Sequence, residues 1–149
     1  MTGSELKKLL VKNLPAIDNH GEVVEEIGGD RVRIRLPFRD EYMGEDVWGK
    51  SGSRVFSGPI TMGLADTSMY GCVLSAFGEN VIPVIVTLTI NFLSPVKAAD
   101  LIAESRIIRR GKSLVNLETY LYCDGSEKPA AHITSTYAIR GRGKADFGD

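Results

Sequence analysis

The sequence predicts an α+β domain in which an antiparallel sheet wraps around one long buried helix. Residues 57–77 are apolar on nearly every helical face, which is typical of a helix surrounded by protein. Four long strand-like segments follow, and short turns join the last three of them, as in antiparallel sheets. Because a sheet and a helix can bury each other's apolar faces, we expect residues 1–149 to form one domain. Residues 1–20 are then an N-terminal helical extension, and residues 141–149 are a flexible tail.

The composition is that of a globular domain without a general affinity for nucleic acid. Of 149 residues, 43% are hydrophobic and 25% are charged, and 18 basic residues nearly balance 19 acidic ones. The chain shows neither a signal-peptide pattern nor an apolar run that could span a bilayer, so we expect a cytoplasmic protein without membrane contact. In that compartment Cys72 and Cys123 are expected to be free thiols. Two histidines and two cysteines do not favour a structural zinc site.

The first part of the chain is predicted to form a helix and a hairpin. Residues 4–14 place their leucines on one helical stripe, and Ser4 is the expected N-cap. Residues 22–26 and 31–36 are predicted as two short strands that a glycine pair at 28–29 connects. The extension is therefore expected to lead into the edge of the sheet.

A polar segment separates this hairpin from the long helix. Residues 37–54 are glycine-rich and are predicted to be an irregular loop, in which Trp48 either lines a pocket or packs in the core. Ser57 is the expected N-cap of the helix, and Gly78 is its expected end.

The rest of the chain is predicted to be strands. Their expected bounds are 84–93, 101–110, 113–123 and 130–140. In the first of them, the apolar residues are predicted to share one face of the sheet: Val84, Val86, Leu88, Ile90 and Phe92.

Asp66 is a charged residue in the middle of the apolar helix. Burying an ionised carboxylate without partners is costly, so three explanations remain open. Asp66 faces solvent through a crevice, or it belongs to a structural hydrogen-bond network, or it is a catalytic carboxylate in a partly dry site.

The start of the same helix is a second candidate feature. The first amides of a helix have no internal acceptor, and the helix dipole is positive there. Ser57-Gly58 therefore either forms an ordinary capped helix start or offers the Gly58 N–H to a carbonyl oxygen, as in an oxyanion hole.

Asp66 and the helix start are too far apart to act together within one chain. Asp66 comes nine positions after Ser57, which is about 13 Å along a helix axis. A two-fold dimer can place Asp66 of one chain beside Gly58 of the other, so a site of this kind is expected between subunits.

The third candidate is the basic turn Arg109-Arg110-Gly111-Lys112. Such a turn is either a solvated hairpin tip or a contact for phosphate oxygens, which arginine binds with two parallel hydrogen bonds. In a chain that is otherwise nearly neutral, the turn suits a small polyanion better than a nucleic-acid duplex.

Three segments together resemble the hotdog-fold acyl-CoA thioesterases, and most closely their PaaI-like (phenylacetic acid degradation) subgroup. These segments are residues 58–67, which include Ala65-Asp66-Thr67, residues 88–95 with the sequence Leu-Thr-Ile-Asn-Phe-Leu-Ser-Pro, and residues 109–112. The similarity extends from about Phe56 to Ile139. It implies a hotdog fold, homodimers or homotetramers, and active sites between subunits.

The resemblance also implies a role for each candidate residue. Asp66 matches the catalytic carboxylate, as general base or nucleophile, and Gly58 matches the backbone donor for the thioester oxygen. Residues in the matching motifs are expected on the substrate and coenzyme A side of the site: Thr67, Thr89, Asn91, Arg109, Arg110, Gly111 and Lys112. No metal or redox cofactor is implied, because coenzyme A enters only as part of the substrate.

The chain departs from the family pattern at two positions. It has Ser57 where the family commonly has a histidine, and Ser51-Gly52 where the family often has an asparagine in the preceding loop. Ser57 keeps a hydrogen-bonding group at the catalytic centre, but it cannot carry a positive charge. A serine nucleophile at Ser57 is not favoured, because neither histidine is close in sequence and no G-x-S-x-G motif surrounds it.

The predicted function is therefore hydrolysis of an acyl- or aryl-CoA thioester. A non-catalytic acyl-CoA binder or scaffold is the alternative that the missing histidine leaves open. A hotdog-fold hydratase is disfavoured, because such enzymes pair the aspartate with a histidine five residues later, and position 71 is Gly71.

Overall fold

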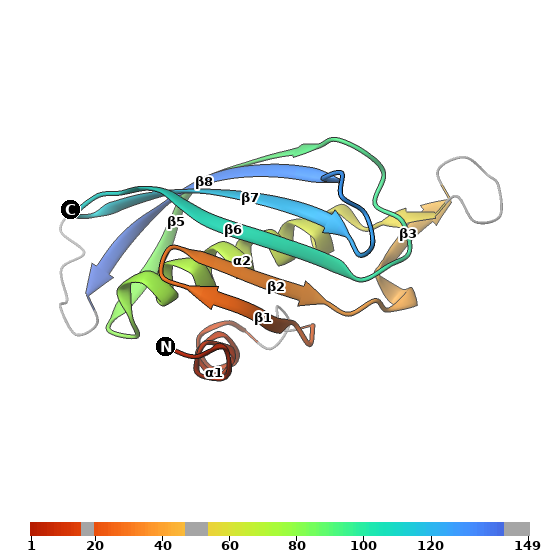
Figure 1. Cartoon of the computed structure of the whole chain (residues 1–149). Coiled ribbons are helices and arrows are strands. Elements are labelled where there is room, and N and C mark those ends of the chain that lie inside the picture. The colour runs from red at the N-terminus through yellow and green to blue at the C-terminus, as the bar shows by residue number, and fades with distance from the viewer. Residues whose placement is uncertain (16–19, 47–53, 142–149) are drawn as a thin grey trace.

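Figure 1 shows a curled antiparallel sheet around one long helix, α2, which confirms the predicted fold class. The computed structural model describes residues 1–15, 20–46 and 54–141. A short 3₁₀ helix, Asp40–Tyr42, precedes β3. The other elements follow in chain order: α1 (Gly3–Asn13), β1 (Val23–Gly28), β2 (Arg31–Leu36), β3 (Met43–Asp46), β4 (Arg54–Phe56), α2 (Gly58–Phe77), β5 (Val81–Phe92), β6 (Leu101–Arg110), β7 (Leu114–Cys123) and β8 (Ala131–Gly141).

The main sheet has six strands in the order β1-β2-β6-β7-β8-β5. Each neighbouring pair is antiparallel, so β1 and β5 are the two edges. Helix α2 lies inside the curl, and α1 packs below β1 and α2 (Figure 1). The predicted N-terminal helix is therefore present, and it closes the side of α2 that the sheet leaves open near β1.

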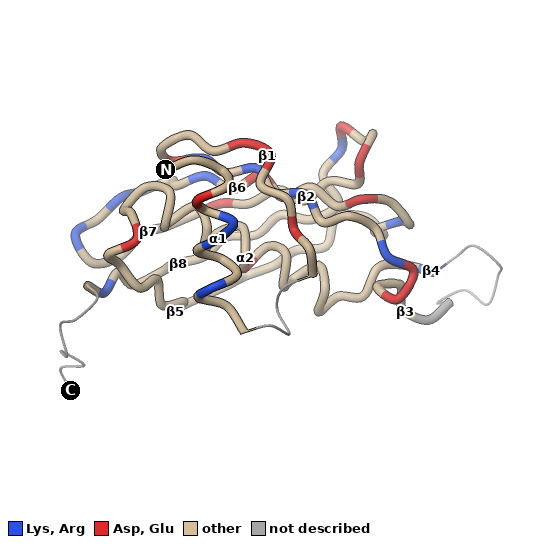
Figure 2. Tube along the Cα trace, turned by 90° about the horizontal axis from the view of Figure 1, so that it is seen from below, with Lys and Arg blue, Asp and Glu red and all other residues tan. Residues whose placement is uncertain are grey.

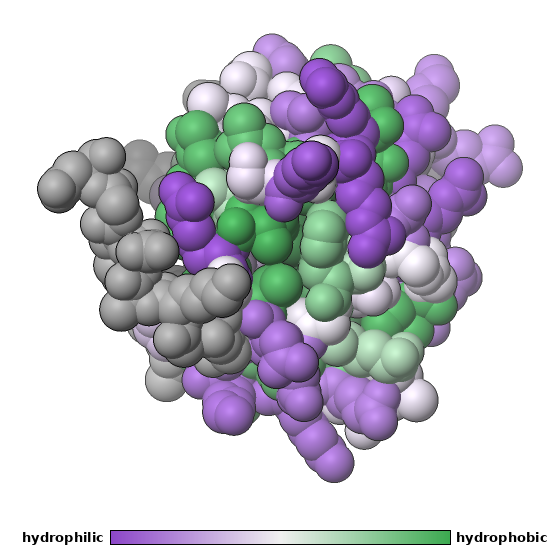
Figure 3. Space-filling view, turned by 90° about the vertical axis from the view of Figure 1, so that its left-hand side faces the viewer, coloured by the Kyte–Doolittle hydropathy of each residue, from purple (hydrophilic) through white to green (hydrophobic). Residues whose placement is uncertain are grey.

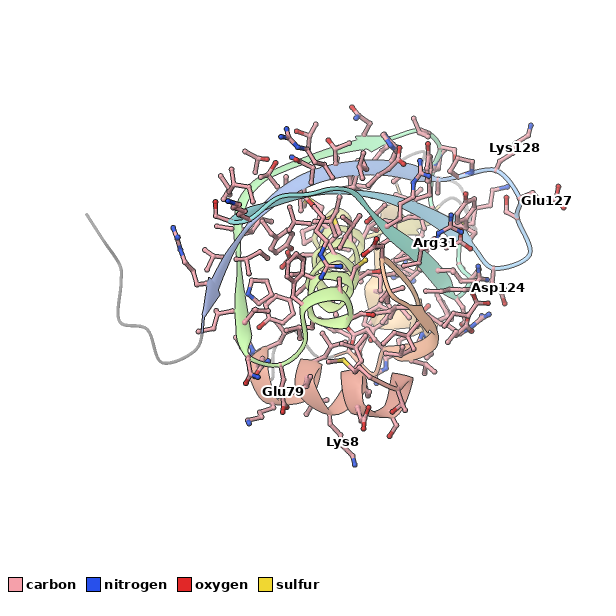
Figure 4. All side chains as sticks on the ribbon, turned by 60° about the vertical axis from the view of Figure 1, so that its left-hand side comes forward. Lys8, Arg31, Glu79, Asp124, Glu127 and Lys128 are labelled. Carbon is pink, nitrogen blue, oxygen red and sulfur yellow. The ribbon has the colours of Figure 1, made fainter. Side chains whose placement is uncertain are left out.

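Helix α2 is the centre of the hydrophobic core. Its buried apolar residues are Leu64, Ala65, Met69, Cys72, Val73 and Leu74. Figure 4 shows side chains filling the space between α2 and the curled sheet, whereas charged residues such as Lys8 and Lys128 point outwards. Cys72 and Cys123 are free, as predicted, and burial raises the pKa of the Cys72 thiol to about 12.

One of the two predicted N-caps differs from the observed one, and the other, Ser57, is the observed N-cap of α2 but lacks a side-chain capping bond. In α1 the cap is Thr2, not Ser4: its hydroxyl accepts from the Glu5 N–H, and the Glu5 carboxylate accepts from the Thr2 N–H. This reciprocal pair satisfies two amides at once and so begins the helix earlier. In α2 the Ser57 hydroxyl makes no capping bond, although Gly78 ends the helix as predicted.

Strand β5 begins at Val81, and a bulge divides its apolar residues between two faces. Ile85 pairs with Tyr137 but Thr87 pairs with Thr136, so Val86 is the extra residue. Directly paired residues share a face, so Leu88, Ile90 and Phe92 lie on one face as predicted, which is the face toward α2, whereas Val84 lies on the outer face. The single-face prediction is wrong for Val84, because strict alternation does not allow for an inserted residue.

The segment predicted as an irregular loop is partly ordered. Strands β3 and β4 pair antiparallel, with Met43 opposite Phe56. Tyr42 and Phe56 are buried and pack against each other, with ring centroids 5.9 Å apart. These aromatic contacts stabilise a hairpin that a polar, glycine-rich composition does not predict. Trp48, Ser51-Gly52 and the tail 142–149 lie outside the described residues.

A chain of buried hydroxyl groups connects α2 to the sheet. Ser68 Oγ of α2 lies 2.8 Å from Ser105 Oγ of β6, which lies 2.6 Å from Thr119 Oγ1 of β7. All three residues are buried. Because buried hydroxyl groups need partners, these bonds favour one alignment of α2 on β6 and β7.

We expect Ser105→Ala to lower the free energy of unfolding by about 1–3 kcal/mol, because it removes both bonds and leaves two buried hydroxyl groups unpaired. Urea denaturation measures the change. Ser113→Ala is the control, because Ser113 is exposed in the turn between β6 and β7, and such changes stay within about 0.5 kcal/mol. Equal stability of Ser105→Ala and the control would show that the hydroxyl chain does not hold α2 in place.

Candidate functional site

Helix α2 has one stripe that the described residues of the chain leave exposed or partly exposed. Pro59, Met62 and Gly63 are exposed, and Asp66 and Tyr70 are partly exposed. These residues are three or four positions apart and so share one face of the helix. The prediction of a buried helix therefore holds for the faces toward the sheet and α1 but not for this stripe. Asp66 is the only charged residue of α2, and it lies in the middle of the stripe.

The Asp66 carboxylate has a hydrogen-bond donor from the sheet. Tyr137 of β8, which is 1% exposed, donates its hydroxyl to Asp66 Oδ1. Burial, together with the negative charge of Asp66, raises the pKa of Tyr137. Of the three explanations for Asp66, partial exposure and a hydrogen-bond partner are both observed, and they leave a catalytic role open. Sequence reasoning did not identify Tyr137, although a buried tyrosine normally needs a partner for its hydroxyl.

Backbone bonds hold the start of α2 in place. The Phe56 N–H donates to the Val96 carbonyl at 2.9 Å, and the Ser57 N–H donates to the Tyr42 carbonyl at 2.8 Å. The Ser57 carbonyl accepts from both the backbone and the hydroxyl of Thr61. The next residue, Gly58, is the first of the helix, so its N–H has no intrahelical acceptor.

An apolar groove of about 470 Å³ opens beside Gly58. A Cβ atom built on Gly58 would meet nothing within 4 Å, so the described residues leave open space beside this glycine. The volume lies within the range of small-molecule sites, about 300–1,000 Å³. Its lining residues are Val55, Phe56, Gly58, Phe92, Leu93, Ser94, Pro95 and Val96. The groove can accept an apolar group next to a backbone donor.

The structure does not bring Asp66 and Gly58 together within one chain. Asp66 is eight positions after Gly58 in an uninterrupted helix, which corresponds to about 12 Å along its axis. A carbonyl group that accepts from the Gly58 N–H is therefore out of reach of Asp66 in the same chain.

Three residues of the predicted substrate side do not lie next to Asp66 on the open stripe. Thr67 is buried, at 5% exposure. Thr89 and Asn91 flank Ile90, which pairs with the buried Ile133, so both lie on the outer face of the sheet. In a single chain they are therefore on the side of the sheet opposite α2. Their role in substrate binding stays a prediction.

The cations of the basic turn between β6 and β7 differ in their contacts with the rest of the protein. The Arg110 guanidinium lies over the Phe77 ring, 4.2 Å from its centroid, and donates to the Ala76 carbonyl at 2.8 Å. Arg110 therefore binds the last turn of α2, whose carbonyls have no helical partner. Arg109 and Lys112 are exposed and remain candidates for a phosphate contact. Figure 3 shows this end of the molecule, where hydrophilic side chains border an apolar area.

The backbone of the turn leaves no room for a side chain at Gly111. Its N–H donates to the Leu114 carbonyl at 2.9 Å and closes the turn. A Cβ atom at this position would lie 2.7 Å from the same carbonyl oxygen. The tight turn therefore requires glycine, whether or not a ligand binds beside it.

The described part of the chain contains no cluster of three His, Cys, Asp or Glu side chains that could hold a metal ion. None of its helices combines the length and the apolar character needed to cross a membrane.

Comparisons with known proteins bear on the family and the fold of the chain. The sequence profile of the thioesterase superfamily matches residues 54–130, a segment that contains the start of α2, Asp66 and the basic turn. No curated protein sequence matches the chain.

Solved structures share the fold over nearly the whole chain. A candidate thioesterase from Silicibacter sp. TM1040 has a TM-score of 0.80 and 24% identity, over 94% of this chain and 92% of that one. A thioesterase from Haemophilus influenzae has a TM-score of 0.80 and 18% identity, over 98% and 95%. A mutant thioesterase from Pseudomonas aeruginosa has a TM-score of 0.76 and 17% identity, over 95% of each chain. At these identities the likeness establishes the fold alone.

We expect Gly111→Ala to lower the free energy of unfolding by about 1–3 kcal/mol, because the new methyl group displaces the Leu114 carbonyl. Thermal unfolding of the variant measures the loss. Gly28→Ala is the control, because a Cβ atom there meets nothing within 4 Å. A Gly111→Ala protein as stable as wild type would show that the turn does not require glycine.

Proposed function

The chain belongs to the thioesterase superfamily, and from this membership we propose that it is an acyl-CoA thioesterase, most similar to the PaaI-like subgroup. It hydrolyses an acyl- or aryl-CoA thioester to the free acid and coenzyme A. The observation that carries the proposal is the position of Asp66, the single charged residue of α2, on the stripe of the helix that the described residues leave partly exposed. The cytoplasmic location expected from the sequence stays a prediction.

The proposed chemistry needs a carboxylate, a backbone donor and water. The Gly58 N–H, at the positive end of the α2 dipole, stabilises the negative charge that develops on the thioester oxygen. Asp66 either removes a proton from water as the oxygen adds to the carbonyl carbon, or attacks that carbon itself to form an anhydride, which water then cleaves. In both routes the carbon–sulfur bond breaks, and the thiolate of coenzyme A leaves and takes up a proton.

We propose that two copies of the chain form each active site. Strand β5 is an edge of twelve residues without a charged side chain (Figure 2). Its exposed apolar residues are Ile82, Val84, Ile85, Val86 and Phe92. Long apolar edges tend to pair with another strand, and a two-fold pairing of β5 with β5 covers this one. The two α2 helices then run antiparallel, so that Gly58 of one copy approaches Asp66 of the other, in a dimer or in a tetramer of two such dimers.

The groove and the basic turn suggest which parts of the substrate bind where. The apolar walls beside Gly58, which include Phe56, Phe92 and Leu93, suit the acyl or aryl group. The exposed cations Arg109 and Lys112 suit phosphates of coenzyme A. Thr67, Thr89 and Asn91 are proposed contacts of the assembled oligomer.

A non-catalytic acyl-CoA-binding protein is the second candidate, and Ser57 in place of the family's histidine favours it. A hydratase is not proposed. Position 71 faces α1, where the Cβ position of Gly71 is 3.5 Å from Leu6 Cδ2, so a catalytic side chain there would have to displace α1.

We expect Asp66→Asn to lower kcat for hydrolysis by about 10²-fold or more, because the amide can neither take up a proton nor attack the carbonyl carbon. Release of free thiol from a panel of aromatic, short-chain and long-chain acyl-CoA esters measures the rate. Glu127→Gln is the matched control, because it makes the same change in an exposed loop. Wild-type turnover by Asp66→Asn would exclude the mechanism, and tight binding of the esters without hydrolysis by the wild type would favour the second candidate.

We expect Val86→Glu to convert the dimer to monomers and to abolish hydrolysis with it. The side chain is 56% exposed on the β5 edge, so two new carboxylates would face each other across the two-fold axis without disturbing the core. Sedimentation velocity measures the assembly. Ile108→Glu is the control, because Ile108 is 58% exposed but lies on β6, away from this edge. An active Val86→Glu monomer would exclude a site between subunits.

A further inference from the structure

Tyr137 is a buried tyrosine whose hydroxyl meets the proposed catalytic carboxylate. The hydroxyl donates to Asp66 Oδ1 and lies 3.4 Å from the Asp66 carbonyl oxygen. Asp66 is partly exposed, whereas Tyr137 is 1% exposed. The bond therefore joins Asp66, which a substrate can contact, to Tyr137, which a substrate cannot reach.

Two side-chain bonds fix the position of β8 on α2. Ser135, two residues before Tyr137 on the same face of the strand, donates its hydroxyl to Met69 Sδ at 2.8 Å. Met69 follows Asp66 by three residues, so both bonds reach the same side of the helix. β8 is held between β5 and β7, so Tyr137 is attached to a rigid part of the sheet.

The protonation state of Tyr137 supports a role as a permanent donor. Burial raises the pKa of its hydroxyl, and the negative charge of Asp66 raises it further, with a smaller contribution from Tyr70. The hydroxyl therefore keeps its proton at neutral pH. It can only donate to the carboxylate and does not compete with Asp66 as a base.

We propose that Tyr137 is a positioning residue for thioester hydrolysis, which binds Oδ1 of Asp66 and leaves Oδ2 for the attacking water or the thioester carbon. This inference rests on the proposed function. The bond orients the carboxylate and stabilises its charged form, which is the form that acts as base or nucleophile. The chain thus provides the carboxylate with a neutral donor from the sheet, although Ser57 stands where the family commonly has a histidine.

The test is Tyr137→Phe, which keeps the ring and removes only the hydroxyl. We expect kcat to fall by about ten-fold or more, the usual effect of losing a hydrogen bond to a charged group, while KM changes less than two-fold. A purely structural role of Tyr137 would not separate kcat from KM in this way.

Tyr122→Phe is the matched control, because it removes a tyrosine hydroxyl from β7 on the outer face of the sheet, and its kcat and KM should equal those of wild type. In the Asp66→Asn background, Tyr137→Phe should change the residual turnover by less than two-fold, since it acts through the carboxylate. A further ten-fold loss in that background, or an unchanged kcat of Tyr137→Phe alone, would overturn the proposal.

A measurement without substrate separates this inference from the proposed function. At pH 7 the ¹³Cγ resonance of Asp66, assigned by its absence in Asp66→Asn, should have a different chemical shift in Tyr137→Phe than in wild type, because the carboxylate loses the hydrogen bond. An absence of hydrolysis together with this difference would overturn the thioesterase proposal while preserving the Tyr137–Asp66 interaction. Identical chemical shifts in both proteins would overturn the role of Tyr137 even in an active enzyme.

Discussion

The burial of α2 is the constraint on which the rest of the structure depends. A helix of twenty residues with one charged side chain must be covered on nearly all sides, because exposed apolar surface is unfavourable in water. The curled sheet and α1 cover most of it, and the stripe that contains Asp66 stays open. A carboxylate tolerates this place because it is partly exposed and accepts a hydrogen bond from Tyr137. The burial of α2 therefore explains both the curl of the sheet around the helix and the partly exposed position of Asp66.

Most of the fold could be predicted from the sequence, because strong periodic patterns depend on local residues alone. The predicted bounds of the 101–110 strand are those of β6, and the long helix ends at Gly78 as expected. The bulge at Val86 was not predictable, since it depends on how β5 pairs with β8. The β3–β4 hairpin was missed for a similar reason: its stability comes from contacts between residues that are distant in sequence.

Residues of the candidate site could be predicted only where their chemical type or their position in the sequence is unusual. Asp66 stands out in an apolar helix, and Gly58 is identified by its place at the helix start. Tyr137 has no such signal, because an inward-facing tyrosine in a strand is ordinary core until its hydroxyl is matched with an acceptor. Arg109 and Arg110 are equivalent in sequence, and only the position of Phe77 and of the Ala76 carbonyl distinguishes them.

Because α2 is rigid, the proposed enzyme can carry out its chemistry only when two copies of the chain assemble. The amide donor at Gly58 and the carboxylate of Asp66 are about 12 Å apart on a continuous helix, and no side-chain rotation can close that gap. A hinge in α2 would expose its apolar core. A second antiparallel α2 supplies the missing group without distorting either helix. In the proposed dimer, pairing of the two β5 edges also buries the apolar residues that β5 exposes in a single chain, so the same contact would stabilise the protein and complete both sites.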